Sequence, residues 1–436
     1  MKKKNSTPST KNINSLRSEN DFLKKNRIRN TTGISLVEFF WGMGIPTLIE
    51  STFLQLFLRD LGASYLLIGM LPMFLGISIP VFSLVSAYFT THFEYKRPIV
   101  ILLHMGSALP VLLFGVYLLV FRPADGILPL FLIVYAVFTS GIGLTISVWQ
   151  NFLVKIFHEK DSLRSLSVMM IAQSLAKIIA SYGLIKVVEQ YALSIRGAGF
   201  VFTAVGISLF FGAILFLITR ESGKTDENLV PFKSPAHFFI TMKDLLQNKR
   251  FLVFIGNDLN YFSVLAALSF YANYATEYGG IHPALVAGLF VGFGYAGGIA
   301  VQVVLGWMNI LPLKGKFLFS KAAAFSGLLL LIFMPVLPAF LAAAFLLGAS
   351  RDVRKLAYPP AIKNIARGRD ATVHFAFAAL LELPVSSGLP LISGWFLDIY
   401  PGGGMVAYKI LFTVLALVTV ISTVFTLRLS FPAVEK

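Results

Sequence analysis

Apolar runs of about 20 residues recur along nearly the whole chain, and short polar stretches separate them. An α-helix of that length crosses the roughly 30 Å hydrocarbon core of a bilayer, because each residue adds about 1.5 Å. Charged residues make up only 13% of the chain, whereas a soluble domain carries roughly 25%. The pattern therefore predicts an all-α membrane protein.

Twelve transmembrane helices are predicted, in two sets of six on either side of a polar stretch. The first set lies at 34–57, 64–89, 97–120, 127–153, 165–188 and 197–219. The second set lies at 251–275, 283–308, 317–337, 339–362, 371–397 and 405–429.

Five segments follow from this layout. We expect a basic, disordered cytoplasmic tail over 1–32, an N-terminal six-helix half over 33–219, a cytoplasmic linker over 220–250, a C-terminal half over 251–430 and a short cytoplasmic tail over 431–436. Helical periodicity near the end of the linker predicts a short helix at the membrane surface.

Basic residues indicate the orientation. Most of the 37 lysines and arginines fall in segments on the side of the N-terminus, and the loops on the other side hold Arg59, Arg122, Lys186, Arg196 and Lys409. The positive-inside rule then places both termini in the cytoplasm. The net charge of +16 has the same origin, so a nucleic-acid partner is not expected. A plasma membrane, the inner membrane in a bacterium, is the expected location.

The two halves resemble one another in sequence. The segment "SYLLIGMLPMFLGISIP" matches "HPALVAGLFVGFGYAGGIA", which aligns Gly69 with Gly288. A second match aligns Gln173 with Glu382 and, by the same spacing, sets Arg351 opposite Ile142. Two halves that start on the same side of the membrane are parallel repeats, related by an axis along the membrane normal.

This layout resembles the major facilitator superfamily over about residues 33–430. The family carries a G-x-x-x-D-R-x-G-R-R loop after the second helix of each half. Here its basic residues survive as Lys96, Arg97, Lys314 and Lys316. Its acid and central glycine are missing from the first copy, where Glu94 is the candidate replacement. The resemblance implies a transporter that works by alternating access, and no characterised subfamily matches.

The stretch "RDVRK" at 351–355 is the most informative local feature. As a loop it would leave the preceding apolar stretch too short to cross the membrane. We therefore predict a charged cluster in the middle of the tenth helix. Arg351, Asp352, Arg354 and Lys355 share about 160° of the helix circumference. Such charges normally face a cavity and find partners, because an unpaired charge is costly in a bilayer.

Other spans hold candidate partners for this cluster, and their charges are close to balance. We assign Arg351, Arg354, Lys355, Lys177 and Gln173 to binding of an anionic group. The candidate proton carriers are Glu50, Glu38, Asp258, Glu382 and Asp352. Three structural alternatives stay open: Glu38 could reach the headgroups, Lys177 could pair with Glu382 between the halves, and His104 fits a packed, hydrogen-bonded histidine.

These features predict a secondary transporter for a small polar or anionic organic solute, coupled to H⁺ or Na⁺. Membrane lipid is the other expected partner, and we expect a monomer. Motifs for catalysis, a cofactor or a metal are not found in the sequence. A translocator of lipids, amphiphiles or drugs is the alternative, and a sensor that moves no solute is a further one.

Overall fold

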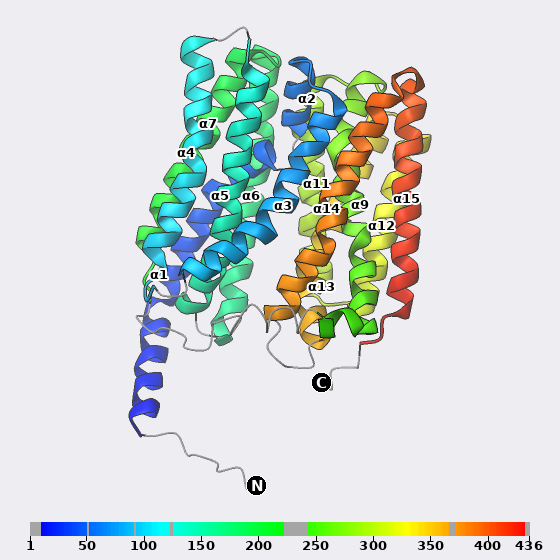
Figure 1. Cartoon of the computed structure of the whole chain (residues 1–436). Helices are drawn as coiled ribbons and strands as arrows, with labels where there is room; N and C mark the ends of the chain where they lie inside the picture. The colour runs from blue at the N-terminus through cyan, green and yellow to red at the C-terminus, as the bar shows by residue number, and fades with distance from the viewer. Residues whose placement is uncertain are drawn as a thin grey trace.

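The structure is a computed structural model of the chain, and it describes residues 10–49, 52–90, 93–122, 125–157, 159–221, 243–365 and 372–431. Within these ranges the regular structure is entirely helical. Long helices run side by side in two groups, one blue to green and one green to red (Figure 1). The first and last described residues lie at the same end, which we call the proximal end; the opposite end is the distal end.

The N-terminal half contains α1 (Thr10–Leu48), α2 (Thr52–Asp60), α3 (Tyr65–Thr90), α4 (Arg97–Phe121), α5 (Ile127–Ile156), α6 (Glu159–Tyr191), α7 (Ile195–Leu215) and η1 (Phe216–Ile218). The first expected span is thus divided into α1 and α2. Pro46 lies just before the division, and proline removes a backbone donor from a helix and clashes with the preceding turn.

The C-terminal half repeats the arrangement. It contains α9 (Lys249–Glu277), α10 (Pro283–Leu285), η2 (Val286–Phe290), α11 (Val291–Val301), η3 (Gln302–Trp307), α12 (Leu313–Phe333), α13 (Leu337–Ile365), α14 (Thr372–Ile399), η4 (Pro401–Gly403) and α15 (Gly404–Arg428). The elements α10, η2, α11 and η3 together form the expected eighth span. Its two η segments are π-helical.

The prediction of an all-α membrane protein is confirmed. Among the described residues, eleven helical stretches are long and apolar enough to cross a membrane. The twelfth expected span is α13, whose 29 residues also suffice to cross, at about 1.5 Å per residue. Its charged cluster, and not its length, separates it from the other eleven. The cluster lies inside this helix and is not a loop, as predicted.

The N-terminal segment differs from the expectation of a disordered tail over 1–32. Helix α1 already begins at Thr10. Asn30 is fully buried, and its side-chain amide donates to the carbonyl oxygens of Ile156 and Arg220, both at 2.9 Å. Its side-chain oxygen accepts from the Arg220 N–H at 2.7 Å. These bonds fix the start of the first span against the end of α5 and against the residues that follow η1.

The linker lies mostly outside the described residues, and so does the tail after Phe431. Residues 243–247 are helical, which is the described part of the surface helix expected there. Asn248 then begins α9, because its side-chain oxygen accepts hydrogen bonds from the Arg250 and Phe251 N–H groups at 3.1 and 3.2 Å. Such a cap satisfies donors that the first helical turn leaves free.

Glycines allow the two halves to approach closely at two equivalent places. A Cβ atom on Gly69 in α3 would lie 2.5 Å from the carbonyl oxygen of Pro390 in α14. A Cβ atom on Gly288 in η2 would lie 2.6 Å from the carbonyl oxygen of Ser181 in α6. Gly69 and Gly288 are the pair that the repeat aligned, so both copies of the glycine serve the contact between halves.

Polar contacts join the halves at the distal end. Arg59 Nε of α2 lies 3.3 Å from Glu277 Oε1 of α9, and the hydroxyl of Tyr65 also donates to this carboxylate. Asp398 of α14 accepts hydrogen bonds from the N–H groups of Tyr65 and Leu66 at 2.8 and 2.7 Å. The Asp398 carboxylate therefore caps the N-terminus of α3. We call this set of contacts the distal gate.

A charged cluster organises the proximal end of the N-terminal half. The carboxylate of Glu221 accepts hydrogen bonds from the N–H groups of Lys96 and Arg97, both at 2.8 Å, and lies 3.8 Å from Lys155 Nζ. Burial and the neighbouring charge of Lys155 lower the pKa of Lys96. Glu221 thus takes the place proposed for Glu94, which is exposed and contributes its carbonyl oxygen to Lys155 at 2.5 Å.

We predict that Asn30→Ala lowers the stability of the folded protein by roughly 2 kcal/mol, because it leaves buried backbone groups at Ile156 and Arg220 without partners. The matched control is Asn26→Ala, one turn earlier on α1, whose side chain donates within its own helix to the Phe22 carbonyl oxygen. Thermal melts of both variants in mild detergent test this. Equal melting temperatures would contradict the anchoring role of Asn30.

Candidate functional site

A close helix crossing positions the charged cluster of α13. A Cβ atom on Gly348 would lie 2.0 Å from the carbonyl oxygen of Gly294 in α11. One turn further along α13, the carboxylate of Asp352 occupies the space in front of Gly298, where a Cβ atom would lie 2.4 Å from Asp352 Oδ2. Small residues at a helix contact let the two backbones approach. The crossing therefore places the carboxylate of Asp352 in contact with α11 at Gly298.

Asp352 is the centre of one charged group. Lys355 Nζ lies 2.7 Å from Asp352 Oδ1, and Arg351 Nε lies 3.5 Å from the same oxygen. Gln302 donates to Asp352 Oδ2 at 3.3 Å. Gln302 is the first residue of the π-helical segment η3, and such wide turns often occur at functional sites. One carboxylate here meets two cations.

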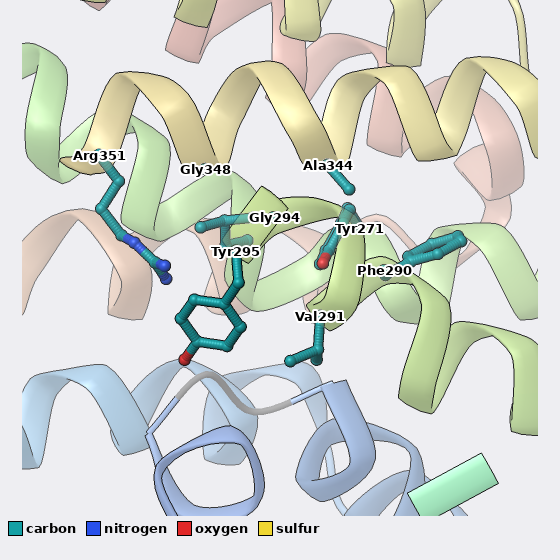
Figure 2. A pocket seen from close by; sticks show the side chains of 9 residues that line it. Tyr271, Phe290, Val291, Gly294, Tyr295, Ala344, Gly348 and Arg351 are labelled. Carbon is teal, nitrogen blue, oxygen red and sulfur yellow. The ribbon is translucent and has the colours of Figure 1, made fainter. Parts of the chain in front are cut away.

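Lys177 of the N-terminal half lies close to the Asp352 group, because Lys177 and Arg351 both lie near the ring of Tyr295. Lys177 Nζ lies 4.5 Å from the ring centre, and Arg351 Cζ lies 5.4 Å from it. Figure 2 shows Arg351 and Tyr295 together at a small cavity, with the Tyr295 ring extending toward the blue helices of the N-terminal half. The cavity is about 20 Å³, enough for roughly one water molecule. Lys177 and Arg351 are both buried.

Arg354 forms a second charged group, which joins three helices. Its Nε lies 2.6 Å from Asp258 Oδ2 of α9, and its Nη2 lies 2.9 Å from Glu382 Oε2 of α14. The hydroxyl of Tyr358 donates to Glu382 Oε1 at 3.1 Å. The rings of Tyr261 and Tyr358 lie 4.3 and 4.1 Å from Arg354 Cζ. The guanidinium thus has two carboxylates and two aromatic faces around it.

Glu38 and Gln173 form a third group, inside the N-terminal half. The Gln173 amide donates to Glu38 Oε2 at 2.6 Å, and Glu38 is buried. Gly42 makes this contact possible, because a Cβ atom there would lie 2.6 Å from the Gln173 carbonyl oxygen. Lys177 follows Gln173 by one turn of α6 and interacts electrostatically with Glu38. Both Glu38 and Gln173 border a cavity of about 250 Å³.

The predicted site residues therefore fall into three groups. Glu50 lies outside the described residues. The structural alternative that paired Lys177 with Glu382 is wrong, because Glu382 binds Arg354 and Tyr358 instead. Glu38 is buried, and its carboxylate accepts a hydrogen bond from Gln173. His104 is packed and hydrogen-bonded as expected, with Nδ1 2.7 Å from the Val100 carbonyl oxygen.

Sequence reasoning missed several partners of these groups. Lys321, within the expected span 317–337, is buried in α12, where its Nζ donates to the carbonyl and side-chain oxygens of Asn257 at 2.9 and 3.0 Å. Tyr295, Gln302 and the tyrosines around Arg354 were also missed. The signal that could have found Lys321 is its place one turn after Phe317, well inside an apolar run.

Comparison with known proteins identifies the family. A family model described as Major Facilitator Superfamily matches residues 33–353. None of the curated proteins compared with this chain matches it.

Solved structures share the fold at low identity. A structure of the nucleoside transporter NupG (D323A mutant) has a TM-score of 0.72 at 10% identity, covering 92% of this chain and 100% of that one. A bacterial homologue of the human lysosomal transporter Spinster, inward-facing and unoccupied, has a TM-score of 0.64 at 14% identity, covering 94% and 99%. A POT family transporter in complex with 5-aminolevulinic acid has a TM-score of 0.67 at 12% identity, covering 91% and 96%. This chain is a multi-pass membrane transporter and belongs to the Major Facilitator Superfamily.

Proposed function

We propose that the protein is a proton-coupled secondary transporter that moves a small organic solute with an anionic group by alternating access. The observation that carries this proposal is the meeting of Lys177 and Arg351 on Tyr295, where the two halves touch. A solute bound there would contact both halves at once, as alternating access requires.

The charge of this meeting point favours an anion. Lys177, Arg351 and Lys355 bring three positive charges against two carboxylates. Asp352 pairs with Arg351 and Lys355, and Glu38 interacts with Lys177. Arg351 and Lys177 are buried, while the side chain of Lys355 is 41% exposed. Buried cations normally require counter-charges, so an anionic group of the solute would complete the balance.

Two carboxylates around one guanidinium suggest a proton carrier. Arg354 has one positive charge, and both Asp258 and Glu382 contact it. One of these carboxylates can take a proton while the other keeps Arg354 paired. Glu38, Asp352 and Glu50 remain further candidates for this role, and Na⁺ could use the same oxygens.

The distal gate supports an inward-facing state. We place the proximal end in the cytoplasm, because basic residues such as Lys96, Arg97 and Lys155 gather there. The ion pair between Arg59 and Glu277 then closes the outer side. Transport requires these contacts to break when the protein changes to its outward-facing state.

We predict that Arg351→Ala lowers uptake of the anionic solute at least about tenfold, because it removes a charge-assisted contact. Folding should survive, since Asp352 keeps its ion pair with Lys355. Uptake into proteoliposomes, with a panel of organic anions, measures this. The control is Lys186→Ala, an exposed cation on α6 that pairs with Glu189. Wild-type uptake in Arg351→Ala, or binding of amphiphiles alone, would refute the anion site.

We predict that Glu382→Gln abolishes accumulation driven by a proton gradient but keeps exchange of solute across the membrane. The amide cannot take up a proton, while Asp258 still neutralises Arg354. Accumulation at an inward proton gradient is compared with counterflow at equal pH on both sides, and Glu189→Gln serves as the surface control. Undiminished accumulation by Glu382→Gln would exclude this carboxylate as the essential carrier.

We predict that Arg59→Gln shifts the protein toward a state open at the distal end, since the ion pair with Glu277 is lost. The chain has no cysteine, so spin labels can be placed cleanly at Asp60→Cys and Gly402→Cys. Asp60 is exposed, and a Cβ atom on Gly402 meets no atom within 4 Å. Longer label-to-label distances are expected in Arg59→Gln.

The matched control for this gate is Arg196→Gln. Arg196 lies over Tyr191 and Phe200 of its own half, so its loss removes contacts within that half. An unchanged distance distribution in Arg59→Gln, the same as in Arg196→Gln, would show that the ion pair does not hold the gate closed.

A further inference from the structure

The cavity beside Glu38 is lined by residues of the N-terminal half alone. Its volume is about 250 Å³, and its walls come mainly from α1 and α5, with single residues of α4, α6 and α7. Most of the lining is apolar, and the residues with polar groups are Glu38, Trp41, His104, Thr145, Trp149 and Gln173. A carboxylate thus borders an otherwise apolar and aromatic space.

The internal repeat shows what fills the matching space in the C-terminal half. The segments "LPLFL" at 128–132 and "LPAFL" at 337–341 align α5 with α13 at the spacing that relates Gln173 to Glu382. That spacing sets Thr145 opposite Arg354 and Trp149 opposite Tyr358. One further spacing, between α1 and α9, relates Glu38 to Asp258 and Trp41 to Tyr261.

In the C-terminal half these positions surround a cation. Arg354 touches Asp258 and Glu382, and the rings of Tyr261 and Tyr358 lie close to its guanidinium carbon, at 4.3 and 4.1 Å. Carboxylates and aromatic faces are the two kinds of group that stabilise a buried guanidinium.

In the N-terminal half the surroundings are kept but the cation is not. Glu38 replaces Asp258, Gln173 replaces Glu382, and Trp41 and Trp149 replace the two tyrosines. Thr145 stands where Arg354 would be. All five residues border the cavity. The cavity is therefore the space that a guanidinium group occupies in the other half.

We propose that this cavity binds a cationic organic group, a guanidinium or a substituted ammonium, with Glu38 as its counter-ion and Trp41 and Trp149 as aromatic walls. Tryptophan is the best of the aromatic side chains at binding cations through its ring. A volume of about 250 Å³ is below the roughly 300–1,000 Å³ of sites for drug-sized ligands, so it suits one end of a solute.

This inference refines the proposed function and rests on it in one respect, namely that the bound group belongs to the transported solute. Lys177 lies one turn from Gln173 on α6 and interacts electrostatically with Glu38. An anionic group at Lys177 and Arg351 and a cationic group beside Glu38 could therefore belong to the same small molecule. The solute is then a zwitterion.

Phenylguanidinium and phenylurea provide a matched test of the cavity, because they share a shape and differ in charge. Binding of each to the purified full-length protein in mild detergent is measured by calorimetry at neutral pH. We expect phenylguanidinium to bind at least about tenfold more tightly, since phenylurea can donate hydrogen bonds to the Glu38 carboxylate but has no positive charge to form an ion pair with it. Equal affinities, or no binding of either, would overturn the proposal.

Two variants locate the binding. Glu38→Gln removes the counter-ion and keeps the shape, and Thr145→Arg supplies the cation that the C-terminal half already has. Both should weaken phenylguanidinium binding at least about tenfold, while Glu189→Gln, on the surface of α6, should leave it unchanged. Thermal melts identify any variant that fails to fold. Wild-type affinity in the folded Glu38→Gln and Thr145→Arg proteins would place the ligand elsewhere.

The variant Arg351→Ala separates this inference from the proposed function. Phenylguanidinium has no anionic group, so its binding should not depend on Arg351. If phenylguanidinium fails to bind but anion uptake depends on Arg351, the cavity proposal is wrong and the transport proposal stands. If phenylguanidinium binds through Glu38 but uptake is insensitive to Arg351, the cavity holds a cation and the anion site is wrong.

Discussion

Burial of charge is the constraint on which this structure depends. A charged side chain in the apolar interior of a membrane protein is stable only beside groups that neutralise it or donate to it. Arg354 meets this requirement with Asp258 and Glu382, which lie on two other helices. The ion pairs therefore fix how α9, α13 and α14 lie against one another. Gly294 and Gly298 of α11 let its backbone approach α13 closely, and this contact positions the carboxylate of Asp352.

Much of the fold could be predicted from the sequence because a membrane leaves few choices. Every backbone group must be satisfied within its own segment, so apolar runs become helices. The same rule placed "RDVRK" inside α13, since a loop there would have left too short a span. What the sequence could not show is which acid meets which base. That depends on helix rotation and tilt, so the sequence left a pairing of Lys177 with Glu382 open, whereas Arg354 is the partner of Glu382 in the structure.

Local exceptions to helix rules were also invisible in the sequence. Gln302, the first residue of the π-helix η3, donates to Asp352. The hydropathy of a sequence does not distinguish a π-helical turn from an α-helical one. The N-terminal segment is polar enough to suggest disorder. Asn30 is nevertheless buried, and its side chain makes three hydrogen bonds with the backbone of Ile156 and Arg220. In both cases a tertiary contact overrides the local pattern. Glu50 remains an assignment from sequence alone.

The repeat explains how one fold can hold two different charge patterns. Both halves keep an acid in their first helix and a polar partner in their fifth, but only the C-terminal copy has an arginine between them among the described residues. Lys177 and Arg351 then face one aromatic ring from opposite halves. Like charges repel one another, and the carboxylates of Asp352 and Glu38 offset part of that repulsion here. In the proposed cycle the solute supplies a further anionic group, so its arrival changes the force between the two halves that must move.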